Sequence, residues 1–151
     1  PSPAFRLLMR ADGPKEIVRG DGPDQEALRA AKAEVAAELA AAKRVGPRVR
    51  GEVALIRFAS PAQVHPLVAQ AWRGRLPDKI VIAANEGYRE GWVHFAARTA
   101  TGTNLVDWFG ARRPEGAGAH YGSGHAAASG GALTPGQWRA FLNTIGFEDA
   151  A

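Results

Sequence analysis

The chain has 151 residues, of which 46% are hydrophobic and 23% charged, a composition that suits one packed domain and argues against wholesale disorder. It has no cysteine, which excludes a disulfide framework, a thiolate nucleophile and any cysteine-ligated metal site. Lysine and arginine number 19 against 15 acidic residues, and this net charge of +4 favours an anionic partner. No apolar run reaches the roughly 20 residues of a membrane-spanning helix, so we expect a cytoplasmic protein with no membrane partner. The chain begins at Pro1 without methionine or an apolar signal core, and we expect a piece of a longer protein.

The N-terminal third of the chain predicts one long helix. Residues 1–22 carry glycine and proline breakers and predict an extension with one short strand over 5–9. Apolar residues recur at helical spacing over 23–44, with Asp21 and Asp24 as the predicted capping residues. The apolar stripe of this helix is mostly alanine, which indicates a connector that arrives from an upstream domain.

Two apolar strands with a helix between them follow. Residues 53–58 are apolar on both faces, as in an interior strand, and 79–84 form the next strand. Ser60 is the predicted N-cap of the helix and Gln63 the capping-box partner, while a proline in the pattern moves the start towards His65. The predicted buried stripe of this helix consists of Val64, Leu67, Val68, Ala71 and Trp72.

A turn signal over 85–91 predicts a hairpin whose second strand is 92–98. Alternation along this strand assigns one set of side chains to the core: Val93, Phe95 and Ala97. The opposite face then carries Trp92, His94, Ala96 and Arg98. A histidine and an arginine therefore share one side of one strand, where a ligand could contact them.

The last third of the chain predicts two helices around a glycine-rich segment. Asn104 or Thr103 caps the first, short helix, and Thr134 with Gln137 forms a capping box for the last one. Seven of the 18 glycines lie in 110–131, where we expect one short strand. The elements together predict an α/β (α+β) fold, with a mixed central β-sheet flanked by helices and preceded by the long connector helix.

The segment that begins Gly122-Ser123-Gly124-His125 is the strongest candidate for chemistry. Its glycines permit positive φ and a close approach of the backbone to a ligand, and successive amides in such a loop can form an anion-binding nest. The adjacent imidazole of His125 could donate to a phosphate oxygen. It is not a P-loop, because Ala126 follows where a P-loop has Ser or Thr. A surface loop with an incidental histidine is the alternative.

Residues 122–131, Gly-Ser-Gly-His-Ala-Ala-Ala-Ser-Gly-Gly, resemble the Gly-Gly-Gly-His-x-x-Ala-Ala-Gly motif of the DHH-associated domain. That domain is the C-terminal part of DHH-family phosphoesterases such as the RecJ exonuclease and the nano-RNA oligoribonucleases. The strand 93–98 is similar to the family's strand ending in Ser-x-Arg, and the resemblance extends over about 50–147. Ser123 and Ser129 depart from the motif, since the family has glycine and alanine there.

The resemblance implies a substrate-binding role. In the family, this domain holds a terminal nucleotide or phosphate through the glycine segment, its histidine and the strand arginine. The matching positions here are Arg98, Gly122, Ser123, Gly124, His125, Gly130 and Gly131. The family's catalytic half binds two manganese ions, and this chain has no Asp-His-His triplet, so we expect no cofactor and no catalytic residue in it. The implied division is an extension over 1–22, a connector helix from a missing catalytic domain over 23–49, and the DHH-associated domain over 50–151.

Further contacts and alternatives stay open at this stage. His94, Trp92 and His120 are additional candidates for substrate contact, and Trp92 could stack on a base. His65 is better explained as a capping or core residue, and without carboxylates at ligand spacing we expect no metal site. The expected partners are single-stranded or short nucleic acid or a nucleotide, an upstream DHH domain, and a second copy of the chain. A tRNA-binding or dimerisation module is the alternative function. DNA, RNA and cyclic dinucleotide are not distinguished.

Overall fold

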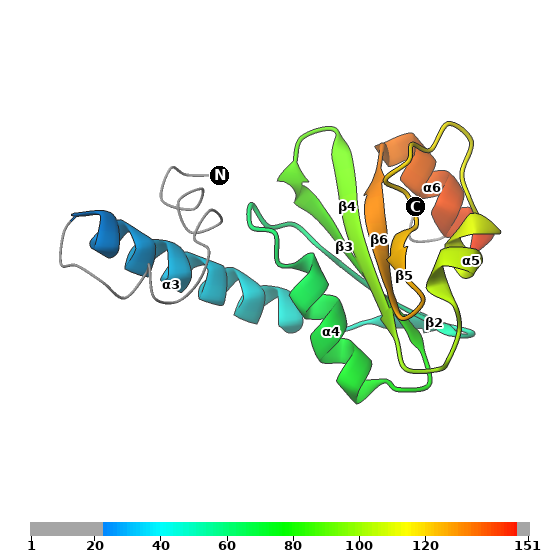
Figure 1. The fold of residues 1–151 in the computed structure, drawn as a ribbon, viewed down its shortest axis with the longest axis horizontal. Helices are drawn as coiled ribbons and strands as arrows, with labels where there is room; N and C mark the ends of the chain where they lie inside the picture. Colours follow the sequence, from blue (N-terminus) through cyan, green and yellow to red (C-terminus); the bar gives the residue numbers. More distant parts are fainter. Residues whose placement is uncertain (1–22, 148–151) are drawn as a thin grey trace.

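The computed structural model describes residues 23–147, and the predicted strand 5–9 and the capping residue Asp21 lie outside this range. Its helices are α3 (Pro23–Lys43), α4 (His65–Arg75), α5 (Leu105–Gly110) and α6 (Pro135–Thr144). Its strands are β1 (Arg48–Arg50), β2 (Val53–Phe58), β3 (Ile80–Arg89), β4 (Trp92–Thr99), β5 (Ser123–His125) and β6 (Ala128–Leu133). Figure 1 shows the sheet between the helices, with α3 extending away from it.

The six strands of the described region form one mixed sheet in the order β1-β2-β3-β4-β6-β5. The β2 and β3 strands run parallel, because α4 connects them as a crossover, and the other neighbouring pairs are antiparallel. The predicted α/β fold, with a mixed sheet, flanking helices and a long helix in front, is confirmed. The division of the chain into domains stays a prediction.

Each face of the sheet has its own apolar core. On one face α5 and α6 cover Leu55, Ile82, Phe95 and Leu133 with an aromatic cluster that consists of Trp108, Phe109, Tyr121, Trp138 and Phe141. On the other face α3 and α4 cover Ala54, Ile56, Val81, Ala83 and Ala96. The predicted alternation of β4 is confirmed, since Val93, Phe95 and Ala97 belong to the first core and Ala96 to the second.

The α3 helix packs against the second core through its C-terminal half. Ala42 is buried there, and Val35 and Leu39 are partly buried against the same cluster. One hydrogen bond reinforces this contact, because Ser60 Oγ donates to Glu38 Oε2 at 2.7 Å. The predicted long helix over 23–44 is therefore confirmed to within one residue at its C-terminus, while its role as a connector stays a prediction.

Ser60 is not the N-cap of α4, and that prediction is wrong. The helix begins at His65 after Val64, which makes no side-chain cap, and a proline lies in its first turn. The Ser60 hydroxyl is instead occupied by Glu38 and by the amide of Ala62. The predicted stripe also changes, because Leu67 is 50% exposed whereas His65 and Ala69 are buried.

The hairpin between β3 and β4 is tighter than predicted. β3 continues to Arg89, the turn contains Gly91 at φ +79°, and the register shifts between Asn85 and Arg89. Asn85 is fully buried beside this irregularity: its Oδ1 accepts from the amides of Ser60 (3.0 Å) and Gly87 (3.1 Å), and its Nδ2 donates to the Ala62 carbonyl at 2.9 Å. One side chain thus holds the β2–α4 loop against β3.

The predicted helix caps in the C-terminal region are confirmed. Asn104 Oδ1 accepts from the Asp107 amide at 3.3 Å, which selects it over Thr103 as the cap of α5. Thr134 and Gln137 form the reciprocal capping box of α6.

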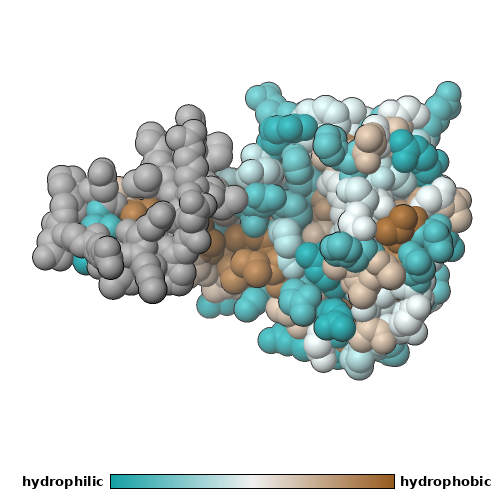
Figure 2. Space-filling model, viewed as in Figure 1, coloured by the Kyte–Doolittle hydropathy of each residue, from teal (hydrophilic) through white to brown (hydrophobic). Residues whose placement is uncertain are grey.

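The surface is mostly hydrophilic in the view of Figure 2, with apolar area gathered near α4. Between residues 23 and 147 no helix has the length and apolar content that crossing a membrane requires.

Candidate functional site

Arg98 and His125 lie on the same face of the sheet. Arg98 of β4 pairs with Ala128 of β6, and Ala128 pairs on its other side with His125 of β5. Directly paired residues point to the same face, and two strand spacings separate the outer pair by roughly 10 Å. Because Arg98 also pairs with Val81, which belongs to the core beneath α3 and α4, all these side chains are on the α4 side.

The Arg98 side chain reaches from β4 to the neighbouring strand β6. Its Nη1 donates to the Ala97 carbonyl at 2.9 Å and to the Ser129 carbonyl, on β6, at 3.4 Å. Burial and then the charge of Arg73 lower the pKa of Arg98, although an arginine stays protonated in proteins. Arg73 itself reaches over from α4, where its Nε donates to the Thr99 carbonyl at 3.2 Å. Two guanidinium groups therefore meet at this corner, which favours an anion there.

The predicted glycine loop is a β-hairpin. Residues 123–125 and 128–133 are its strands, and the turn is held in place because the carbonyls of Ala126 and Ala127 accept from the amides of Leu105 (2.7 Å) and Thr99 (3.2 Å). His125 is exposed on the edge strand β5. Its position is thus fixed by the backbone of α5 and β4.

The glycines of the hairpin are required by close packing. A Cβ on Gly130 would lie 2.6 Å from the Phe95 carbonyl oxygen, and one on Gly131 would lie 2.4 Å from that of His120. Gly124 has φ +123°, and its Cβ would lie 2.5 Å from the Ala128 carbonyl oxygen. Gly122 and Gly124 do have the positive φ that the sequence predicts. These contacts explain the glycines through the fold alone, so their part in binding stays a prediction.

His65, Tyr88 and His94 form an aromatic cluster at the other end of the same face. The ring centroids of His65 and His94 are 5.9 Å apart, and those of Tyr88 and His94 are 5.0 Å apart. Burial, then the charges of His94 and Arg98, lower the pKa of His65 to about 4, and burial and Arg89 lower the pKa of His94. His94 and Arg98 are four residues apart along β4, a distance of about 13 Å. The sequence predicts His65 as a capping or core residue, and it is buried. Its contact with His94 could not be predicted, because it depends on how α4 packs on the sheet.

The remaining two candidates lie apart from Arg98. Trp92 is at the start of β4, 37% exposed, with the Arg89 guanidinium 4.7 Å from its ring centroid. His120 is exposed, and its backbone lies against Gly131, whose β4 partner Phe95 belongs to the core beneath α5 and α6. The structure therefore brings together Arg98, Ala128 and His125, and not His120.

The donor set of the described residues does not fit a metal ion. Across 23–147 no group of three or more histidine, cysteine, aspartate or glutamate side chains is arranged to hold one.

Comparison with known proteins finds similarity among solved structures. No protein-family model and no curated protein matches the sequence. Among solved structures, the chain is similar to PggH, a pGpG-specific phosphodiesterase from Vibrio cholerae, with 18% sequence identity and a TM-score of 0.49. The match covers 90% of this chain and 45% of PggH, so the chain spans less than half the length of that protein.

Proposed function

We propose that this chain is the substrate-binding part of a DHH-type manganese-dependent phosphodiesterase, and that it binds a phosphate of a nucleotide or of a short or single-stranded oligonucleotide. The observation that carries the proposal is the alignment of Arg98 and His125 on either side of Ala128. The motif resemblance of residues 122–131 and of strand 93–98 points to the same two side chains.

Arg98, Ala128 and His125, side by side on three neighbouring strands, have the chemistry to bind a phosphate. Ala128, between the two side chains, carries only a methyl group, and Arg98 already reaches β6 through its hydrogen bond to the Ser129 carbonyl. A guanidinium donates two parallel hydrogen bonds to a phosphate, and an imidazole on the opposite side adds a third donor. Arg73 adds positive charge next to Arg98. A phosphate above Ala128 would therefore be held from both sides.

A nucleoside attached to that phosphate would extend along β4. In this proposal the base would contact the partly exposed rings of His94 and Tyr88 at that end of the strand, with the buried His65 behind them. Manganese and the hydrolytic step belong, in this proposal, to an upstream DHH domain, because the described residues hold no cluster of metal ligands.

The proposal is tested by binding of fluorescently labelled short oligonucleotides and of nucleotides to the 151-residue chain. We expect Arg98→Ala and His125→Ala to weaken binding each by about tenfold, as for the loss of a hydrogen bond to a charged group. Unchanged affinity in both variants would overturn the site. Light scattering at several protein concentrations, with and without oligonucleotide, separates this function from a dimerisation module.

A further inference from the structure

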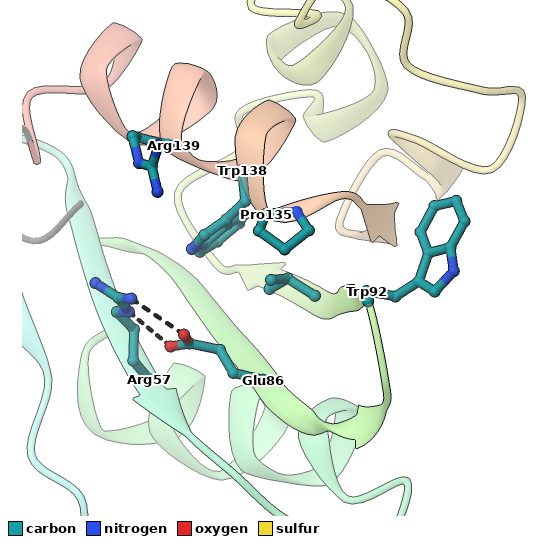
Figure 3. Close-up of a pocket in the computed structure, with 8 residues that line it drawn as sticks. Arg57, Glu86, Trp92, Pro135, Trp138 and Arg139 are labelled. Atoms are coloured by element: carbon teal, nitrogen blue, oxygen red, sulfur yellow. Dashed lines mark hydrogen bonds and ion pairs between the residues drawn. The ribbon is translucent and has the colours of Figure 1, made fainter.

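A pocket lies on the face of the sheet opposite to Arg98 and His125. It has a volume of about 240 Å³ and is formed by the ends of β2 and β3, the β3–β4 turn and the first turns of α6. Figure 3 shows Arg57 and Glu86 rising from the strands, with Trp138 and Arg139 pointing down to them from α6. The proposed phosphate site uses none of these residues.

Trp138 carries an unused hydrogen-bond donor in this pocket. Its ring is 3% exposed and packs on Phe95 and Phe141, with centroid separations of 5.7 and 5.6 Å. The indole Nε1 is buried and has no hydrogen-bond partner. In Figure 3 the nitrogen-bearing edge of the ring is directed to the gap between Arg57 and Arg139. Buried polar groups are nearly always paired, and an indole N–H can only donate, so the missing partner is an acceptor.

The charges around the gap favour an anionic acceptor. Arg57 is matched by Glu86 in a two-pronged ion pair, with Nε–Oε1 at 2.8 Å and Nη2–Oε2 at 3.1 Å. Arg139 is exposed and adds a second positive charge across the gap, which leaves the pocket with a net excess of one. Pro135 is the first residue of the ten-residue α6, so the positive end of the helix dipole also faces this region. A cation would leave the Trp138 N–H unpaired and meet repulsion from Arg139.

We propose that this pocket binds a single oxyanion group, a phosphate or a carboxylate, which accepts from Trp138 Nε1 and pairs with Arg139. The pocket is smaller than the roughly 300–1,000 Å³ of sites that enclose a whole drug-sized ligand. It therefore fits one acidic group of a ligand, with the remainder outside. The site is independent of Arg98 and His125, because it lies under α6 on the other face.

The indole N–H signals of the four tryptophans provide the test. In ¹H–¹⁵N spectra of the 151-residue chain at constant ionic strength, we expect the Trp138 signal, assigned with Trp138→Phe, to shift and saturate as inorganic phosphate or acetate is added. The Trp108 indole already donates to Glu52 Oε1 at 2.8 Å and serves as the internal control. If only phosphate saturates the signal, the ligand carries a phosphate group, and if only acetate does, it carries a carboxylate. If both anions saturate the signal, the pocket binds either oxyanion.

Two variants separate this site from the proposed function. Arg139→Gln changes an exposed side chain and should lower the affinity of the pocket for the anion about tenfold. Arg98→Ala should leave the titration of the Trp138 signal unchanged. The proposal is overturned if the Trp138 signal does not saturate with either anion, or if it titrates equally in Arg139→Gln. Oligonucleotide binding by Arg98→Ala tests the proposed function separately, because this variant keeps every residue of the pocket under α6.

Discussion

Arg98 and His125 are register partners of the same residue, Ala128, from its two sides. Their side chains therefore share one face with a methyl group between them. This arrangement predicts that the two act on one phosphate rather than on two separate ligands.

A double-mutant cycle tests this coupling. If Arg98 and His125 hold the same phosphate, Arg98→Gln and His125→Ala should be non-additive, and the double variant should lose less affinity than the sum of the single losses by about 0.5–3 kcal/mol. The measurement is fluorescence anisotropy with a short oligonucleotide. The control variant is Arg29→Gln, which removes the same charge from an exposed position on α3. Additive losses would indicate two independent contacts.

The buried His65 should make the fold less stable in mild acid. Its pKa is about 4 in the folded chain and near 6.5 when unfolded, so between these values the unfolded state binds more protons. The stability due to neutral His65 is complete above pH 6.5 and is lost as the pH falls to about 4, with a loss of about 2 kcal/mol by pH 5. We expect His65→Gln to flatten this dependence in urea unfolding at several pH values. His120→Gln removes an exposed imidazole and should retain the wild-type profile; equal slopes in all three proteins would contradict the assignment.

Gly131→Ala should destabilise the fold even when no ligand is present. The added Cβ would lie 2.4 Å from the His120 carbonyl oxygen and 2.8 Å from Tyr121 Cα, and both are backbone atoms that cannot rotate away. Overpacking of this kind costs about 1–3 kcal/mol. Gly118→Ala is the matched control, because a Cβ there meets nothing within 4 Å. If thermal unfolding gives both variants the same midpoint, the packing explanation of the glycine motif fails.

Asn85 is expected to be a large single contributor to stability. Asn85→Ala leaves the amides of Ser60 and Gly87 and the carbonyl of Ala62 without their partner in a buried position, and should cost about 2–4 kcal/mol. Asn85→Asp keeps an acceptor for both amides, and at acidic pH its protonated carboxyl also has one O–H that can donate to the Ala62 carbonyl. Chemical denaturation at acidic pH should therefore place Asn85→Asp between wild type and Asn85→Ala. If Asn85→Asp were the less stable of the two variants under those conditions, the stability assigned to these three hydrogen bonds would be contradicted.

Local sequence patterns predicted most of the fold. The interior strand 53–58, the alternation of β4 and the capping box of α6 depend on neighbouring residues, and all three agree with the structure. The N-cap of α4 could not be predicted in this way. The hydroxyl of Ser60 is taken by Glu38, 22 residues earlier, and only the packing of α3 brings the two together.

The candidate site was accessible to sequence reasoning only in part. The shared face of His94 and Arg98 follows from alternation along one strand. The placement of Arg98 and His125 on either side of Ala128 requires the register of β6, and the burial of His65 requires the position of α4. Gly130 illustrates the difference most clearly, since a Cβ there would meet backbone atoms of Phe95 and Ala96, on another strand and more than 30 residues earlier.

The hydrogen bond between Glu38 and Ser60 is a polar contact of fixed geometry between α3 and the β2–α4 loop. An alanine-rich helix face is smooth, and such a face could turn or slide on the sheet with little change in contact. Ser60 also accepts from Ala62, and its amide is held by Asn85, so the hydroxyl that Glu38 meets is itself immobile. The helix is consequently linked to β3 through this loop, in addition to its apolar contacts, and the carboxylate of Glu38 opposes rotation of the helix at that end.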